Sequence, residues 1–232
     1  MPSHLSPFIP QPSFSSFIFP PSSLFNKVLP KNLIYKEARP TKKVKDLFVL
    51  QVKEIVWKYK LSPDTTNLPK KGGYTEIQVF EIQLKTDELA PVVLATIDKA
   101  IPYPIIFRLC RDGQIKVASA YKRPAADGTK KWVVDGLFQT EWTKAGTEGT
   151  PLPIALNMKT LYEQMMLPIL GKEPRNGEQL PDMVQRLDLA RKKERELQLL
   201  ESRLRKEKQF NRKVEINAKI RTLSAELSRL IE

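Results

Sequence analysis

The sequence predicts an α+β domain with a mixed, mostly antiparallel sheet flanked by helices, followed by a long C-terminal coiled-coil-like helix. Helical and strand periodicities alternate between Lys42 and Ile169, and an Asp-Gly pair separates two β-rich runs. Residues 183–232 contain neither Gly nor Pro, and their apolar residues recur at helical spacing. We divide the chain into a disordered or extended N-terminal segment at 1–23, an α+β domain at 24–171, a linker at 172–182 and an amphipathic helix at 183–232.

The first elements of the domain follow from the spacing of apolar residues. Three- and four-residue steps predict an amphipathic helix from Lys42 to Lys60, with Thr41 as its N-cap. Strict alternation then predicts a strand from Thr75 to Lys85. Helical spacing returns between Leu89 and Ile101, where Pro91 fits only in the first turn.

The remaining elements complete an antiparallel sheet. Two β-rich runs, 104–110 and 115–121, flank Asp112-Gly113 and predict a hairpin. Residues 131–142 have the aromatic and β-branched content of a third strand. A short helix between Leu161 and Ile169 then ends near Gly171.

Composition limits the classes of function. The net charge is +13, and it comes almost entirely from residues 1–60 and 182–232, so both flanks could face polyanions. The single cysteine, Cys110, excludes an intrachain disulfide framework, and the single histidine, His4, argues against zinc sites and histidine-based triads. The sequence has neither a signal-peptide pattern nor an apolar run that could span a membrane, which predicts a cytoplasmic protein.

The C-terminal segment indicates association. As one continuous helix it would reach roughly 75 Å, far longer than a typical globular helix, so we expect its apolar stripe to lie against a partner or a second copy. The register of the stripe shifts near Phe210, which is typical of a locally unwound coiled coil. The predicted partner-binding residues are Leu197, Leu200, Leu204, Val214, Ile216, Ile220, Leu223, Leu227 and Leu230. A helix folded back over its own domain is the alternative.

The basic flanks supply candidate phosphate contacts. Lysine and arginine side chains bind the nucleic-acid backbone without base preference, and binding of this kind weakens steeply with salt. The candidates are Lys42, Lys43, Lys45, Lys192, Lys193, Arg203, Arg205, Lys206, Arg212 and Lys213. The same charges could equally form the solvated side of a coiled coil.

One constellation could be catalytic. Glu81, Gln83 and Lys85 project from one face of a strand, and Asp64 lies upstream in a Pro-Asp pair. The pattern looks like the PD-(D/E)xK nuclease signature in its Gln-substituted form, in which carboxylates hold Mg²⁺ and the lysine positions water. The alternative is ordinary turn chemistry at Asp64 and an ordinary amphipathic strand.

Several segments together resemble a known family. LFNKVLPKNLIYKEA, VKEIVWKYKLSPDTTNLP, VFEIQLKTDEL, IDKAIPYPIIFRL and KEKQFNRKVEIN are similar to a bacterial domain-of-unknown-function family found in restriction-like and antiphage gene neighbourhoods. The resemblance runs from about Leu24 to the C-terminus. It implies partners of the type III restriction kind, namely helicase or DNA methyltransferase subunits, but no catalytic residues.

These observations favour a non-enzymatic accessory subunit of a restriction-like or antiphage DNA-processing system. It would associate through its C-terminal helix and contact nucleic acid through its basic flanks, without a cofactor and without a membrane. The first alternative is a metal-dependent nuclease that uses Mg²⁺. The second is a purely structural homo-oligomer.

Overall fold

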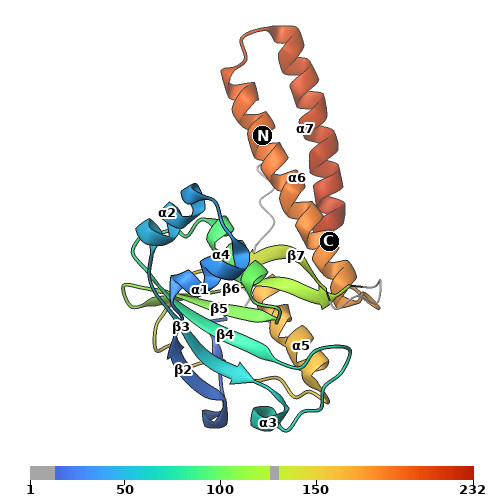
Figure 1. Ribbon diagram of the computed structural model, residues 1–232. Helices are drawn as coiled ribbons and strands as arrows, with labels where there is room; N and C mark the ends of the chain where they lie inside the picture. The colour runs from blue at the N-terminus through green and yellow to red at the C-terminus, as the bar shows by residue number, and fades with distance from the viewer. Residues whose placement is uncertain (1–13, 126–130) are drawn as a thin grey trace. The chain divides into compact units, whose positions relative to one another are not determined.

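The computed structural model describes residues 14–125 and 131–232. The chain forms two compact units, residues 1–173 and residues 174–232. His4 and the first thirteen residues of the predicted N-terminal segment lie outside the described residues. The predicted fold class is confirmed, because the first unit holds a mixed sheet with helices and the second unit is helical (Figure 1).

A seven-stranded sheet organises the first unit. Its main path runs β2-β3-β4-β5-β6-β7, and β8 also pairs with β6. Only β4 and β5 run parallel, joined by a crossover through α4, while the other pairs are antiparallel. The strands are β2 (Leu24–Val28), β3 (Val52–Leu61), β4 (Ile77–Leu84), β5 (Ile105–Arg111), β6 (Gln114–Pro124), β7 (Trp132–Gln139) and β8 (Thr143–Lys144).

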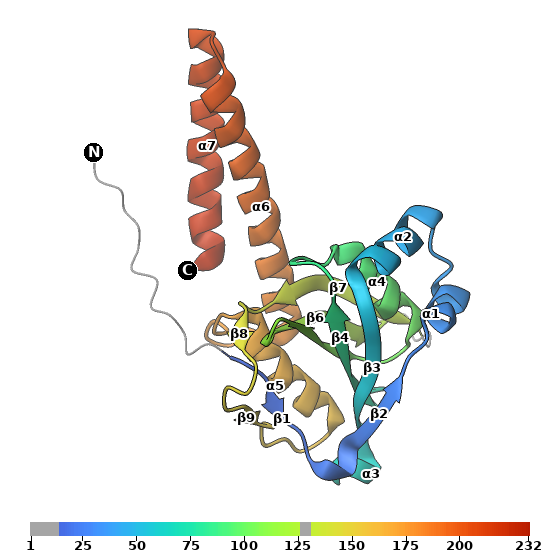
Figure 2. The same cartoon turned by 90° about the vertical axis from the view of Figure 1, so that its left-hand side faces the viewer.

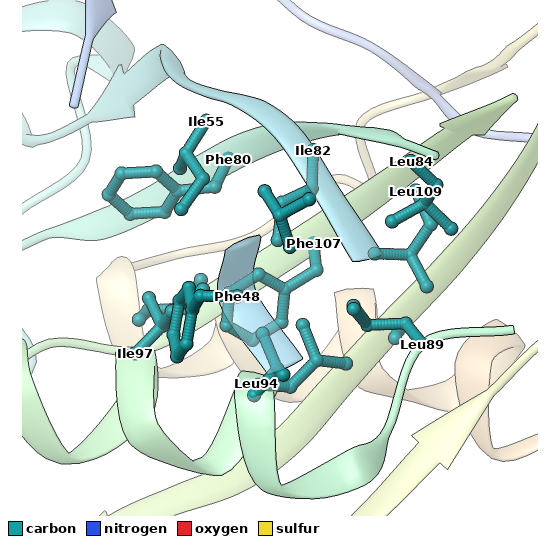
Figure 3. Packing of buried hydrophobic residues seen from close by; sticks show 14 of the residues in the cluster. Phe48, Ile55, Phe80, Ile82, Leu84, Leu89, Leu94, Ile97, Phe107 and Leu109 are labelled. Atoms are coloured by element: carbon teal, nitrogen blue, oxygen red, sulfur yellow. The ribbon is translucent and has the colours of Figure 1, made fainter. Parts of the chain in front are cut away.

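Three helices cover one face of this sheet and enclose the main core. They are α1 (Lys31–Ala38), α2 (Lys42–Gln51) and α4 (Pro91–Ala100). Figure 3 shows Phe48 of α2 and Leu94 of α4 facing Phe80 and Phe107 on adjacent strands. Each of these side chains is completely buried, so the alternating residues of β4 and β5 direct one row into this core.

The opposite face is covered in part by α5 (Met158–Leu170) (Figures 1 and 2). Asn157 caps this helix by accepting a hydrogen bond from the Thr160 amide at 3.0 Å. Tyr162 stacks on Tyr121 of β6, and its hydroxyl donates to the Ala120 carbonyl. The second face therefore contains stacked tyrosines, and the sheet backbone satisfies the Tyr162 hydroxyl.

The described part of the N-terminal segment is an extended strap. It contains β1 (Phe17–Ile18), which pairs in parallel with β9 (Thr150–Pro151), and the short 3-10 helix η1 (Pro21–Ser23). Phe19 is buried and stacks on Tyr59 of β3 at 4.5 Å. For residues 14–23 the structure thus favours the extended alternative over disorder.

Most elements of the domain agree with the sequence analysis. The predicted strand at 75–85 is β4, the helix at 89–101 is α4 with Pro91 in its first position, and the hairpin is β5–β6. Both turn residues, Asp112 and Gly113, have positive φ angles of 44° and 73°, as a type I′ turn requires.

The helix predicted from Lys42 to Lys60 is wrong in its second half. Helix α2 ends at Gln51, and residues 52–61 form β3, a central strand paired with both β2 and β4. The pairing register of β3 shifts between Val52 and Glu54 and again between Trp57 and Tyr59. These bulges break strict alternation and place the apolar residues of a strand at helix-like spacing. Directly after β3, Ser62 is the N-cap of a further short helix, α3 (Pro63–Thr66).

The second unit is a helical hairpin. Residues 180–206 form α6 (Leu180–Lys206) and residues 210–231 form α7 (Phe210–Ile231). The segment is helical as predicted, but it is divided into two helices by a short connection at residues 207–209. The two helices pack against each other, as both views show (Figures 1 and 2).

Candidate nucleic-acid interface

The turn of the hairpin occurs at a polar sequence that contains neither Gly nor Pro. Helix α6 ends where the Glu207 amide donates to the Arg203 carbonyl. The Glu207 carboxylate then accepts hydrogen bonds from the backbone amides of Lys208 and Gln209, at 2.8 and 2.9 Å. These two bonds hold the pKa of Glu207 below its ordinary value. The side chain of Glu207 thus satisfies amides at the point where the next helix begins.

The predicted partner-binding stripe is used inside the chain. Because α7 turns back along α6, the apolar residues of the two helices form a shared seam. Leu223 is buried, and the other seam residues are half-buried, namely Leu197, Leu200, Leu204, Ile216, Ile220, Leu227 and Leu230. Val214 is 53% exposed and stands outside the seam. The second helix therefore covers the apolar stripe of the first without a foreign partner, and association of these residues with a partner stays a prediction.

Charged side chains connect the residues before α6 to the last turn of α7, at the end of the hairpin opposite its turn. The Arg186 guanidinium donates to both carboxylate oxygens of Glu178 at 2.6 Å and to the Leu230 carbonyl at 2.8 Å. Arg175 donates to the Arg229 carbonyl in the same region. Arg186 therefore links the residues before α6 to the last turn of α7, where a cation also complements the helix dipole.

Two of the predicted phosphate-binding lysines have carboxylate partners within the hairpin. Lys193 pairs with Glu226 across the two helices at 2.5 Å, and Lys192 pairs with Asp188 one turn earlier at 2.7 Å. Their charges are partly compensated, so they are weaker candidates for a nucleic-acid interface than the sequence indicated.

The remaining C-terminal candidates gather at the hairpin tip, which we define as residues 203–214. Arg203, Arg205 and Lys206 lie in the last turn of α6, while Arg212 and Lys213 lie in the first turn of α7. All five are exposed, and none forms an ion pair within the described part of the chain. The tip thus concentrates positive charge around one short turn.

Two further tip residues were missed by the sequence analysis. Lys208 is exposed in the connection, and Phe210 is 77% exposed at the start of α7. An exposed aromatic ring among cations can stack on an unpaired base. The signal was present in the sequence as a phenylalanine within a charged run, but it was interpreted only as the point where the register shifts.

The three candidate lysines of α2 belong to the other unit. Lys42, Lys43 and Lys45 are exposed in the first turn of that helix, and the Lys45 ammonium lies 5.5 Å from the centre of the Tyr35 ring. Three cations at a helix N-terminus are disfavoured by the helix dipole. Their placement gives a second, smaller basic patch.

The structure separates Asp64 from the three strand residues of the predicted nuclease site. Asp64 is exposed in α3, beyond the end of β3 at which Leu61 pairs with Ile77. Glu81 lies four positions further along β4, which corresponds to ~13 Å of strand. A single Mg²⁺ ion bonds its oxygen ligands at about 2.1 Å, so these two carboxylates do not share one ion in this arrangement.

The strand residues of that constellation have other partners. Glu81 lies 3.6 Å from the Arg108 guanidinium and accepts a hydrogen bond from Gln83 at 3.3 Å. The Lys85 ammonium donates to the Val49 carbonyl of α2 at 2.8 Å. Across the described ranges, 14–125 and 131–232, no group of three or more His, Cys, Asp or Glu side chains is arranged to hold a metal ion. The amphipathic-strand interpretation accounts for all three residues.

A scan against protein-family models matches residues 17–227 to a domain of unknown function, DUF4391. The chain belongs to this DUF4391 family. Neither the curated proteins nor the solved structures give a match to the DUF4391 chain. None of the helices described in it is long and apolar enough to cross a membrane.

The chemistry available to this DUF4391 protein at the hairpin tip is that of binding. Guanidinium groups form paired hydrogen bonds with phosphate oxygens, and ammonium groups act as point charges. The tip has arginine and lysine on both sides of the turn, so it can face phosphates from two directions.

Proposed function

We propose that this protein is a nucleic-acid-binding accessory subunit, without catalytic activity of its own, of a bacterial restriction-like or antiphage DNA-processing system. In this proposal the hairpin tip contacts the sugar-phosphate backbone. A helicase or DNA methyltransferase subunit would supply the reaction. The system and these partners are proposed from the family resemblance, and the tip is proposed from the structure.

The observation that carries the proposal is the charge of the tip. Between residues 203 and 213 the sequence has six cations and a single carboxylate, Glu207. That carboxylate is directed to backbone amides at the turn. The six cations are exposed, so a polyanion reaches them without displacing an internal partner.

The geometry favours backbone contact over base readout. Arginine and lysine side chains at a helix end bind phosphates and release condensed counterions, which gives affinity without sequence preference. Phe210 adds a stacking surface that is accessible only to unpaired bases. We therefore expect the tip to bind both duplex and single-stranded DNA, with a contribution from Phe210 to the single strand alone.

The test is fluorescence anisotropy with labelled duplex and single-stranded DNA over a range of salt concentrations. A triple variant of the tip, Lys206→Ser, Lys208→Ser and Arg212→Ser, is compared with a charge-matched triple variant of α2, Lys42→Ser, Lys43→Ser and Lys45→Ser. The slope of log affinity against log salt is negative, and in the tip variant the loss of three phosphate contacts should make it less steep by about 2.7 for duplex DNA. The α2 variant should change the slope far less.

Two outcomes would contradict the proposal. Equal losses in both triple variants would mean that total charge, and not the tip, governs binding. Wild-type affinity that does not depend on salt would exclude a phosphate interface altogether. The Phe210→Ser variant completes the test, because it should weaken single-strand binding several-fold while leaving duplex binding unchanged.

A further inference from the structure

A pocket of mixed polarity lies at the end of the sheet where the two parallel strands finish. It has a volume of about 260 Å³, and all the residues that line it belong to the first unit. Strand β4 ends there at Leu84, β5 contributes Leu109 near its end, and α4 begins there at Pro91. Open sheets with parallel strands commonly bind ligands outside the carboxyl ends of those strands. The volume is slightly below that of sites for drug-sized molecules, so it suits one smaller molecule.

The sheet forms one wall of the pocket, and its register places two polar side chains there. Lys116 of β6 pairs with Leu109 of β5, and Gln139 of β7 pairs with Ala118 of β6. Leu109 and Ala118 are buried in the main core, so alternation directs Lys116 and Gln139 to the same face of the sheet. Both are half-buried and line the pocket. Within residues 14–125 and 131–232, no hydrogen bond or ion pair engages the Lys116 ammonium or the Gln139 side-chain amide.

An indole ring positions the ammonium at the pocket. The Nζ atom of Lys116 lies 5.2 Å from the centre of the Trp142 ring, and Trp142 is itself half-buried in the pocket lining. A cation over an aromatic ring is attracted by the ring face, but an ammonium has three N–H groups. Trp142 therefore fixes the position of Lys116 and leaves it able to donate hydrogen bonds to an anionic group.

A second wall is the segment between β4 and α4, and it carries a carboxylate. Glu88 is exposed and lines the pocket, and its carboxylate forms no ion pair with any described residue. The neighbouring Asp87 also lines the pocket, but it pairs with Arg111. The Thr86 hydroxyl donates to the Glu88 carbonyl at 2.8 Å, which fixes the backbone at this position.

The lining selects the type of ligand. It offers the ammonium of Lys116, the carboxylate of Glu88 and an apolar surface, to which Leu84, Leu89, Leu109 and Pro91 contribute. A ligand with a single charge matches only one of the two charged groups, whereas a zwitterion matches both. The apolar surface suits an aliphatic side chain.

We propose that this pocket binds a free α-amino acid with an aliphatic side chain. Lys116 and Gln139 donate hydrogen bonds to its carboxylate, and Glu88 accepts hydrogen bonds from its ammonium. The aliphatic side chain lies against the leucines of the lining. Each of the three polar protein groups is exposed or half-buried, so a molecule that enters from solvent reaches it directly. This site is independent of the hairpin tip and of the proposed nucleic-acid binding.

The experiment uses L-leucine and two derivatives that each lack one charge. L-Leucinamide lacks the carboxylate, and N-acetyl-L-leucine lacks the ammonium. Binding to the full chain is followed by two-dimensional amide NMR, with each compound added up to millimolar concentration. L-Leucine should shift the amide signals of residues lining the pocket, such as Leu89, Lys116 and Gln139. Each derivative should bind about tenfold more weakly, because a hydrogen bond between charged groups is worth roughly that factor in affinity.

Two variants assign each ligand charge to its protein partner. Lys116→Met should weaken L-leucine binding about tenfold and leave the affinity for L-leucinamide unchanged, since that derivative has no carboxylate to lose. Glu88→Gln should likewise weaken L-leucine binding and leave the affinity for N-acetyl-L-leucine unchanged. Lys99→Met, at an exposed position in the last turn of α4, is the matched control and should bind L-leucine as the wild type does.

Several outcomes would overturn the proposal. Absence of L-leucine binding at millimolar concentration would exclude an amino-acid site. Equal affinity for L-leucine and either derivative would show that the corresponding charge is not recognised. An L-leucine affinity that survives Lys116→Met or Glu88→Gln would place the binding elsewhere. The amide spectrum of each variant shows directly whether the variant is folded.

Discussion

Replacing Lys122 by methionine tests the central buried contact of the first unit. The Lys122 ammonium accounts for three carbonyl groups at and after the C-terminal end of α4, and it lies beside the Asp98 carboxylate. The last carbonyls of a helix have no partner within the helix, so this lysine of β6 acts as a cap for α4 from another element. Lys122→Met keeps a long apolar side chain but removes every one of these interactions.

The expected loss is large. Removal of one member of a buried ion pair costs about 3–5 kcal/mol, because the remaining charge is left without compensation. We expect Lys122→Met to lower the free energy of unfolding by about 4 kcal/mol. Asp98→Asn should cost less, about 2 kcal/mol, because the ammonium retains its three carbonyl partners.

The measurement is urea unfolding followed by tryptophan fluorescence. The three tryptophans, Trp57, Trp132 and Trp142, all lie within the first unit, so the signal reports on that unit and is insensitive to the hairpin. A loss below about 1 kcal/mol for Lys122→Met would refute the reasoning. So would a larger loss for Asp98→Asn than for Lys122→Met, because it would mean that the carbonyl contacts contribute little.

Three further predictions concern other contacts. Pairing with Arg186 lowers the pKa of Glu178 to about 2, so the contribution of this ion pair to stability is present above the ordinary pKa of a glutamate and is lost as the pH falls towards 2. After allowance for solvent screening, Glu178→Gln should lower the free energy of unfolding by about 2 kcal/mol at pH 6 and by progressively less between pH 5 and pH 2; thermal unfolding followed by circular dichroism measures this. Leu223→Ala should destabilise the hairpin by about 2 kcal/mol, whereas Val214→Ala should change its stability by less than about 0.5 kcal/mol; equal effects in helical circular dichroism would contradict the seam described above. Gly171→Ala, at a φ angle of 66°, should cost about 1 kcal/mol in urea unfolding, and a neutral result would mean that the end of α5 relaxes.

The parts of the fold that could be predicted from sequence are those with a local cause. The Asp112-Gly113 turn and the position of Pro91 in α4 each depend on the conformations open to one or two residues. The split between α2 and β3 has no such cause. Residues 52–61 become a strand because they pair with β2 and β4, and the bulges that this pairing contains hide the alternation.

In the candidate sites too, the residue types could be predicted from sequence, whereas their arrangement depends on contacts between distant parts of the chain. The cations of the hairpin tip are visible in the sequence, but their grouping depends on a turn at Glu207. The sequence does not indicate this turn, because no Gly or Pro lies there. The buried contact between Asp98 and Lys122 was not predictable, because it requires α4 to pack against β6 and Lys122 to direct its N–H groups at carbonyls. The predicted nuclease grouping depended on spacing along the chain, and the sheet register separates Asp64 from Glu81.

Self-pairing of the C-terminal helices changes what the hairpin offers to other molecules. A single long helix would expose a continuous apolar stripe, and burial of that apolar area would dominate the binding of the helix to other molecules. In the hairpin the stripe is already covered, while the charges at the turn are left exposed and unpaired among the described residues. The surface that remains is therefore electrostatic, and its interactions should weaken as salt increases. An adaptor that used the seam would behave in the opposite way, because apolar association is strengthened by kosmotropic salts such as sulfate. The salt dependence of any complex formed by the hairpin thus distinguishes the two mechanisms directly.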